Sequence, residues 1–80
     1  METNPKVAPN GALNVKLVVN GKQRVVPAGT TLRTLVEDMG AVPSRVVVEH
    51  NLEIVSEDNL ESVEVADGDK VEVIQFVGGG

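Results

Sequence analysis

The residues best suited to chemistry stand at the end of the chain, where Val77 precedes Gly78, Gly79 and Gly80. Glycine has no side chain, so this segment is the thinnest that a polypeptide can form, and it could thread a channel that any Cβ would block. Its distinctive group is the α-carboxylate of Gly80, an anion at neutral pH. A carboxylate is a poor electrophile, so we expect covalent chemistry here to need activation by a partner as an acyl-adenylate made from ATP. Three glycines are equally typical of a plain linker, and the preceding residues must decide between the two hypotheses.

The other ionisable residues do not form the pattern of a catalytic or metal site. Cysteine is absent, which excludes a disulfide, a thiol nucleophile or a persulfide on this chain. The single histidine, His50, has no second ligand near it in sequence, so we expect no metal site and no bound cofactor, and we interpret His50 as a surface loop residue. Asp67 and Asp69 flank a glycine, which favours a solvated turn over an acid–base pair. A solvated edge is also the favoured role of four further acidic residues, with pairing to a basic partner as the alternative: Glu57, Asp58, Glu61 and Glu64.

The composition indicates one small domain with an aliphatic core. Its 80 residues are close to the lower size limit for an independent core, and Phe76 is the only aromatic residue. The formal net charge of −5 disfavours nucleic acid and anionic membranes as partners and suits a protein surface that carries Lys and Arg. No apolar stretch is long enough to span a membrane, and residues 1–12 lack the apolar run of a signal peptide. We therefore expect a cytoplasmic protein that is monomeric when free.

The first ordered element is predicted to be a β-hairpin. Residues 1–12 contain two prolines and no periodicity, which indicates a disordered leader. Residues 13–20 alternate apolar and polar side chains, as in a half-buried strand. Asn20-Gly21 favours a two-residue turn in which both residues have positive φ. Residues 22–26 then return as a second strand, which Pro27 ends.

A single helix is predicted from about residue 31 to residue 39. Leu32, Leu35, Val36 and Met39 recur at helical spacing and form one apolar stripe. A threonine at position 30 or 31 can cap the N-terminus, and Gly40 can end the helix. The stripe has to be buried against another element, which we expect to be one face of a sheet.

The remaining segments complete an α+β domain. We predict short strands at 46–49 and 54–55, a 3₁₀ turn at 56–62 with Leu60 as its apolar anchor, and a long last strand at 70–76. The first and last strands are the longest, so we expect them to lie side by side in the centre, parallel, with the helix in their connection. This is the β-grasp, or ubiquitin-like, fold, a mixed sheet of four to five strands packed on one helix. It would occupy residues 13–76, between the leader and a flexible glycine tail at 77–80.

The alternation of the last strand predicts a docking surface beside the tail. The charged residues at positions 70 and 72 share one face of the strand, so Ile74 and Phe76 lie on that same outer face. The same count along the other strands places Val18 and Val47 there. We interpret Phe76, Ile74, Val47 and Val18 as an exposed apolar patch for a partner. The alternatives are a β-bulge that shifts the register, or an exposed apolar residue without a function.

Residues 13–80 resemble the sulfur carrier of thiamine biosynthesis, the ThiS family. Three segments carry the likeness, namely VVNGKQRVVPAGTTLRTLVEDMG, RVVVEHNLEIV and VADGDKVEVIQFVGGG. A hairpin followed by a helix at the start and a terminal Gly-Gly seldom occur together by chance in one small domain. The sequence departs from the family at one turn, where Asn-Gly is usual and this chain has Asn51-Leu52.

The resemblance implies a carrier, not an enzyme, with a defined set of partners. An E1-like adenylyltransferase would adenylate Gly80. Sulfur from a persulfide on a donor protein would displace AMP to give a C-terminal thiocarboxylate, and thiazole synthase would receive that sulfur. Gly78 and Gly79 would give the tail reach. Other hypotheses stay open, namely a carrier of the same fold for molybdopterin synthesis, a ubiquitin-like protein modifier and a plain interaction module.

Overall fold

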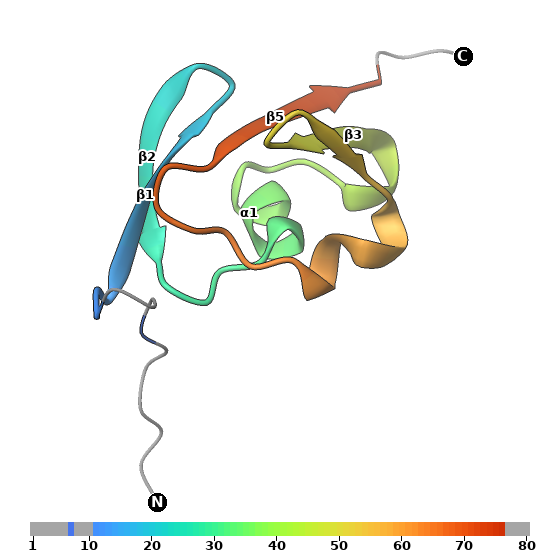
Figure 1. The fold of residues 1–80 in the computed structure, drawn as a ribbon. Coiled ribbons are helices and arrows are strands. Elements are labelled where there is room, and N and C mark those ends of the chain that lie inside the picture. The colour runs from blue at the N-terminus through green and yellow to red at the C-terminus, as the bar shows by residue number, and fades with distance from the viewer. Residues whose placement is uncertain (1–6, 8–10, 77–80) are drawn as a thin grey trace, which may run out of the picture.

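The computed structural model describes Val7 and residues 11–76, which form a five-stranded sheet and one α-helix (Figure 1). The strands are β1 (Asn14–Val19), β2 (Lys22–Pro27), β3 (Val46–His50), β4 (Glu53–Val55) and β5 (Lys70–Gln75). The helix is α1 (Leu32–Asp38), and two 3₁₀ segments are η1 (Pro43–Arg45) and η2 (Glu57–Ser62). Most of the predicted leader at 1–12 and all of the predicted tail at 77–80 lie outside the described residues, so both stay predictions.

The sheet has the order β2-β1-β5-β3-β4, with β5 in the centre. β1 and β5 are parallel, whereas β2 is antiparallel to β1, and β3 is antiparallel to both β4 and β5. The prediction that the first and last strands lie side by side and parallel is confirmed, and the arrangement is that of the β-grasp fold. Because β3 pairs with β5 along residues 71–75, the strand that leads toward the tail is held almost to its end.

The β1–β2 hairpin turns at Asn20-Gly21, as the sequence predicts. Both residues have positive φ, 51° and 82°, and Val19 pairs with Lys22 directly across the two-residue turn. Pro27 is included as the last residue of β2, one residue beyond the predicted end. A proline fits there because β2 is an edge strand, where a missing N–H costs no hydrogen bond within the sheet.

Helix α1 begins after Thr31, whose Oγ1 accepts a hydrogen bond from the Thr34 N–H at 3.2 Å. The predicted apolar stripe is buried at Leu32, Leu35 and Val36. These side chains share one hydrophobic core with the strands, and Figure 1 shows α1 lying over one face of the sheet. We call the face that α1 covers the inner face, and the opposite one the outer face.

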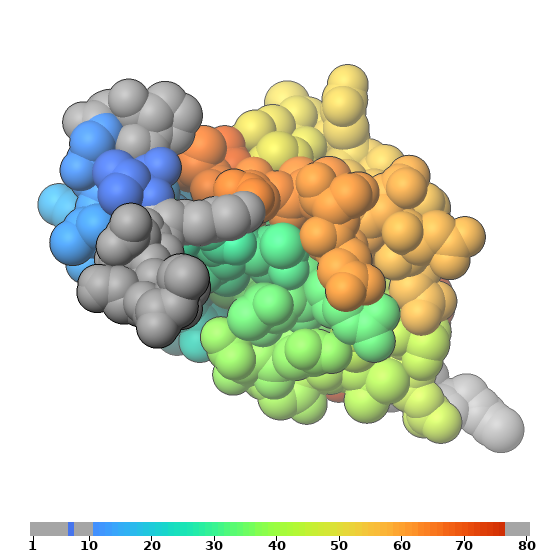
Figure 2. Space-filling model, turned by 90° about the horizontal axis from the view of Figure 1, so that it is seen from below, coloured from blue at the N-terminus to red at the C-terminus, as the bar shows by residue number. Residues whose placement is uncertain are grey.

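The core lies between the inner face and α1, and its fully buried members are all valine or leucine. Leu60, the predicted anchor of η2, is among them. Helix α1 and η2 lie side by side (green and orange in Figure 2), and the Leu32 N–H donates to the Val63 carbonyl at 2.9 Å. An aliphatic core is what the composition predicts. The buried residues are Val15, Leu17, Val19, Val26, Leu32, Leu35, Val36, Val48, Leu60, Val65 and Val71.

The turn between β3 and β4 is tighter than predicted. The predicted strands at 46–49 and 54–55 leave residues 50–53 for the turn, but β3 includes His50 and β4 begins at Glu53, so only Asn51 and Leu52 form it. Both have positive φ, 52° and 73°, the geometry that Asn-Gly favours. A leucine in the left-handed region is strained by about 1–2 kcal/mol.

Candidate functional site

Four apolar side chains gather on the outer face of the sheet, at the end of β5 that leads toward the tail. Phe76 is 63% exposed, Ile74 is 50% exposed and Ile54 is 70% exposed. Val47 is partly exposed beside them. We call these four residues the tail-side patch, and the head of the β5 arrow in Figure 1 marks this end of the strand. Exposed apolar side chains that lie together are typical of contact surfaces, which agrees with the docking surface predicted from the sequence.

The pairing of three strands brings the tail-side patch together. Val47 pairs directly with Ile74 across β3 and β5, and both lie on the outer face, as the alternation predicts. Ile54 pairs with Glu49 across β3 and β4, which makes it a diagonal neighbour of Val47, about 7–8 Å away. Ile54 was not among the predicted docking residues, although a two-residue turn at 51–52 would have placed it opposite Glu49 and therefore on the outer face. The docking role of these residues stays a prediction.

Phe76 is fixed at its backbone while its ring is exposed. Its N–H donates to the Arg45 carbonyl at 3.1 Å, which extends the β3·β5 pairing one step beyond Gln75. Arg45 is the last residue of η1, and η1 begins at Pro43, whose side chain is buried. Phe76, the residue before the predicted tail, is therefore anchored to the domain by its backbone, and its aromatic side chain faces solvent.

Val18 lies on the outer face but away from the tail-side patch. It is opposite Lys70, four residues before Ile74, and therefore about 13 Å away along β5. Its diagonal neighbour is Val25 of β2, which is also exposed. The structure thus brings together three of the four predicted docking residues and places Val18 elsewhere on the same face.

Two carboxylates border the tail-side patch. Glu49 and Glu72 stand directly opposite each other across β3 and β5, and Glu49 is also opposite Ile54. Like charges that face each other in this way repel. A partner that brought a lysine or arginine against them would therefore be favoured. The surface combines apolar contact area with negative charge along one border.

At the opposite end of β5, Asp69 joins separate segments of the chain. His50 Nε2 lies 2.7 Å from Asp69 Oδ2, and Asn51 Nδ2 donates to Oδ1 at 3.1 Å. The Ala66 N–H donates to Oδ2 at 2.8 Å. Burial alone would raise the pKa of Asp69, but these hydrogen bonds to the carboxylate outweigh it, so the pKa lies below its ordinary value of 3.8. We call His50, Asn51 and Asp69 the Asp69 clamp.

The Asp69 clamp reaches the first residue of β5. Asn51 Oδ1 accepts a hydrogen bond from the Lys70 N–H at 2.9 Å, and the Asn51 N–H donates to the Lys70 carbonyl at 2.8 Å. From the other side, Asp67 Oδ1 accepts a hydrogen bond from the Lys16 N–H of β1 at 2.7 Å. β5 therefore starts from a point that is held by both of its neighbours in the sheet.

These contacts correct two interpretations made from the sequence. His50 is not a loop residue without a partner, because it ends β3 and binds Asp69, and the turn at 67–69 is more than a solvated turn. Strand alternation could have found the pair. His50 follows Val48 by two residues and Asp69 precedes Val71 by two residues, so both face the inner side with those buried valines.

Gly78, Gly79 and Gly80, the residues predicted to carry the chemistry, lie outside the described residues. Within Val7 and residues 11–76, no three His, Cys, Asp or Glu side chains gather in a way that could hold a metal ion. None of the helices in that part of the chain has both the length and the apolar character needed to cross a membrane.

Comparisons with known proteins identify relatives of this chain. The ThiS family model matches residues 13–80. A crystal structure of the thiamine biosynthesis protein (ThiS) from Geobacter metallireducens is similar, with a TM-score of 0.67 and 34% sequence identity, over 82% of this chain and 100% of that one. Two curated proteins named thiazole synthase also match over 66 residues, one from Paramagnetospirillum magneticum at 44% identity and one from Magnetococcus marinus at 38%. The matches cover 82% of this chain and 20% of each synthase, so the chain spans about a fifth of the length of these curated relatives.

Proposed function

Because the chain belongs to the ThiS family, the sulfur carriers of thiamine biosynthesis, we propose that it carries sulfur as a thiocarboxylate on Gly80. The protein acts as a cosubstrate of other enzymes and has no turnover of its own. It works in the cytoplasm and is a monomer between its encounters with partners. Its partners are an E1-like adenylyltransferase, a persulfide-bearing sulfur donor and thiazole synthase.

The proposed cycle converts the carboxylate of Gly80 in three steps. In the active site of the E1-like enzyme, a carboxylate oxygen attacks the α-phosphorus of ATP, which releases pyrophosphate and forms an acyl-adenylate. The outer sulfur of the donor's cysteine persulfide attacks the carbonyl carbon and expels AMP, which gives an acyl disulfide. A thiol then cleaves the S–S bond, leaving the thiocarboxylate on the carrier and a disulfide between that thiol and the donor cysteine. On thiazole synthase the sulfur passes to the acceptor substrate, and an oxygen from that substrate or from water takes its place on Gly80, which restores the carboxylate.

The observation that best supports this proposal is the exposed tail-side patch at the base of the tail. The ring of Phe76 faces solvent immediately before residues 77–80. A partner that binds the patch would hold Gly80 within a fixed reach, because four residues extend at most about 13–14 Å. Binding energy from the patch can therefore position a reacting group that makes few contacts itself. The docking surface consists of Val47, Ile54, Ile74 and Phe76, without Val18.

The curated relatives support the choice of thiazole synthase as the recipient. Each of the two proteins with that name contains a segment of 66 residues that is similar to this chain. A carrier and the enzyme that it serves are expected to meet repeatedly, and a shared polypeptide raises the effective concentration of one for the other.

Mass spectrometry of the intact protein tests the proposed function. The purified carrier is incubated with ATP, the E1-like enzyme and the persulfide donor. The expected product is heavier than the starting protein by the difference between one sulfur and one oxygen atom, and fragmentation should place the change on Gly80. A variant that lacks Gly79 and Gly80 should show no exchange while keeping the Tm of the wild type.

Three other outcomes would contradict the proposal. A ladder of conjugates to lysines of other proteins would indicate a ubiquitin-like modifier. Exchange that survives removal of both glycines would place the chemistry on another residue. Sulfur that passes to a molybdopterin precursor, but not to thiazole synthase, would assign the carrier to the other pathway.

A further inference from the structure

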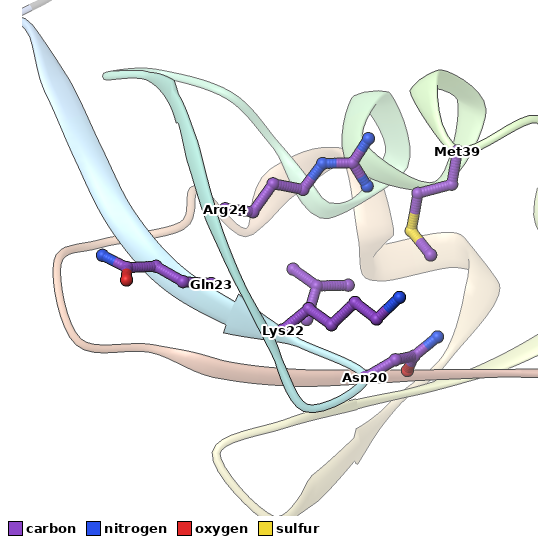
Figure 3. Close-up of a pocket in the computed structure, with 6 residues that line it drawn as sticks. Asn20, Lys22, Gln23, Arg24 and Met39 are labelled. Carbon is purple, nitrogen blue, oxygen red and sulfur yellow. The ribbon is translucent and has the colours of Figure 1, made fainter.

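A notch lined by two cations lies between the β1–β2 hairpin and the end of α1. Figure 3 shows the side chains of Lys22, Arg24 and Met39 on the same side of β2, in the space between the hairpin and the helix, while Gln23 points away. We call this feature the basic notch. It has a volume of about 360 Å³ and is lined by Val19, Asn20, Lys22, Gln23, Arg24 and Met39.

Strand alternation places both cations in the basic notch. Lys22 and Arg24 are two residues apart on β2 and therefore share a face. That face is the inner one, because their partners in β1 are the buried residues Val19 and Leu17. β2 is an edge strand, so the long side chains can keep their charged groups in solvent beside α1 while their methylene groups cover apolar surface.

No ion pair among the described residues neutralises the two cations. Within the part of the chain that the structure describes, the ion pairs involve other residues, namely Arg33 with Glu37 and His50 with Asp69. The protein as a whole has a net charge of −5. Two unpaired cations beside the apolar side chains of Val19 and Met39 thus form a local surface opposite in charge to the average one.

The basic notch opens at the same end of the sheet as the tail. Asn20 on its rim accepts a hydrogen bond through Oδ1 from the Val73 N–H at 2.8 Å. Val73 precedes Phe76 by three residues, which is about 10 Å along a strand. The tail-side patch lies on the outer face and the notch on the inner-face side. A partner that surrounds the base of the tail would therefore contact both.

We propose that the basic notch is a second docking point for the E1-like enzyme and receives a carboxylate side chain of that enzyme. The inference rests on the proposed function, because an enzyme that adenylates Gly80 must hold the tail in a fixed place beside ATP. Arg24 can bind a carboxylate with two parallel hydrogen bonds, and Lys22 adds a second cation. Met39, which is only partly buried, can pack against the methylene groups of the incoming aspartate or glutamate. Because the carrier is acidic overall, this local positive charge also determines the orientation in which the carrier approaches the enzyme.

A double charge reversal tests the inference. K22E/R24E should raise the Kd of the complex with the E1-like enzyme by about tenfold or more at low salt, and the remaining affinity should depend less on salt concentration. The matched control is K16E/K70E, which changes the net charge equally on the outer face, away from the tail-side patch. The control should change the Kd less than about threefold. Both variants should keep the wild-type Tm, because three of the four side chains are exposed and that of Arg24 is only partly buried.

Two results would overturn the inference, namely an unchanged Kd for K22E/R24E or an equal loss of affinity in K16E/K70E. The wild-type carrier is assayed for thiocarboxylate formation with the same enzyme preparation. No thiocarboxylate on the wild type would contradict the proposed function, whereas a modified wild type with normal binding by K22E/R24E would contradict the notch alone. If K22E/R24E has a lower Tm than the wild type, K22Q/R24Q replaces it. This neutral variant should also bind the E1-like enzyme more weakly than the wild type, by a smaller factor than K22E/R24E.

Discussion

The two ends of β5 differ in the kind of contact that surrounds them. At its start, Asp69 and Lys70 are bound by the side chains of His50 and Asn51. At its end, Ile74 and Phe76 expose apolar side chains, and the hydrogen bonds that the structure describes for residues 74–76 join main-chain groups. If the exposed end serves docking, as we propose, and the bound end serves stability, a substitution at one end should leave the property of the other end unchanged.

The largest expected effect is on binding, at the exposed end. Phe76→Asp should weaken the complex with the E1-like enzyme by about 30-fold or more, as expected for a central aromatic contact. Because the ring is exposed, the free energy of unfolding should change by less than about 0.5 kcal/mol. Calorimetric titration and urea unfolding measure the two quantities.

Val25→Asp is the matched control for Phe76, since Val25 is also an exposed apolar residue of the outer face but lies away from the tail. It should bind the enzyme like the wild type. Equal losses of affinity in the two variants would contradict the assignment of docking to the tail-side patch.

The second effect is on stability, at the clamped end. Asp69→Ala should lower the free energy of unfolding by about 1–3 kcal/mol, because it leaves the donors of His50, Asn51 and Ala66 without their acceptor. Urea unfolding measures the change, and Asp58→Ala on the exposed side of η2 should be close to neutral. If Asp69→Ala kept its stability but lost affinity for the enzyme, the start of β5 would serve docking and not stability, which would contradict the comparison.

Acid should weaken the same end of β5. The pKa of Asp69 is lowered in the folded protein relative to its ordinary value of 3.8. Stabilisation by the ionised carboxylate is therefore complete above the ordinary pKa, and it is lost as the pH falls through the lowered folded one. Urea unfolding between neutral pH and pH 3 should show a steeper loss for the wild type than for Asp69→Asn. Parallel curves would show that this carboxylate contributes no pH-dependent stability.

The smallest effect concerns the turn beside the clamp. Leu52 has a φ of 73° and is 79% exposed, so its side chain gains little from burial while its backbone is strained. Leu52→Gly should raise the free energy of unfolding by about 0.5–1 kcal/mol, the strain relieved less the entropy that glycine loses on folding. Ile54→Gly, in the adjacent strand, should lower it. A destabilised Leu52→Gly would show that the leucine makes contacts that outweigh the strain.

Local patterns predicted the elements and the faces of the strands. The Asn20-Gly21 turn, the stripe of α1 and the exposure of Phe76 each depend on residues close together in sequence, and the structure bears out all three. The parallel pairing of β1 with β5 also followed, because one helix between two long strands leaves few other arrangements.

Contacts that depend on the register between distant strands were not predicted. Alternation assigned Val18 to the correct face but gave no position along β5, and the register places it opposite Lys70. The bond between His50 and Asp69 joins residues 19 apart in sequence and needs the order of β3 and β5 as well as their faces. The basic notch requires the position of Met39 relative to the hairpin, which no pattern in the sequence specifies.

The most direct test of the account is the mass of the carrier after one round of activation. With ATP, the E1-like enzyme and a persulfide donor, the protein should exchange a single oxygen for sulfur at Gly80, and Phe76→Asp should reach the same product only at a higher enzyme concentration. An unmodified Gly80 in a wild-type protein that binds the enzyme would contradict the claim that this domain exists to present its C-terminal carboxylate.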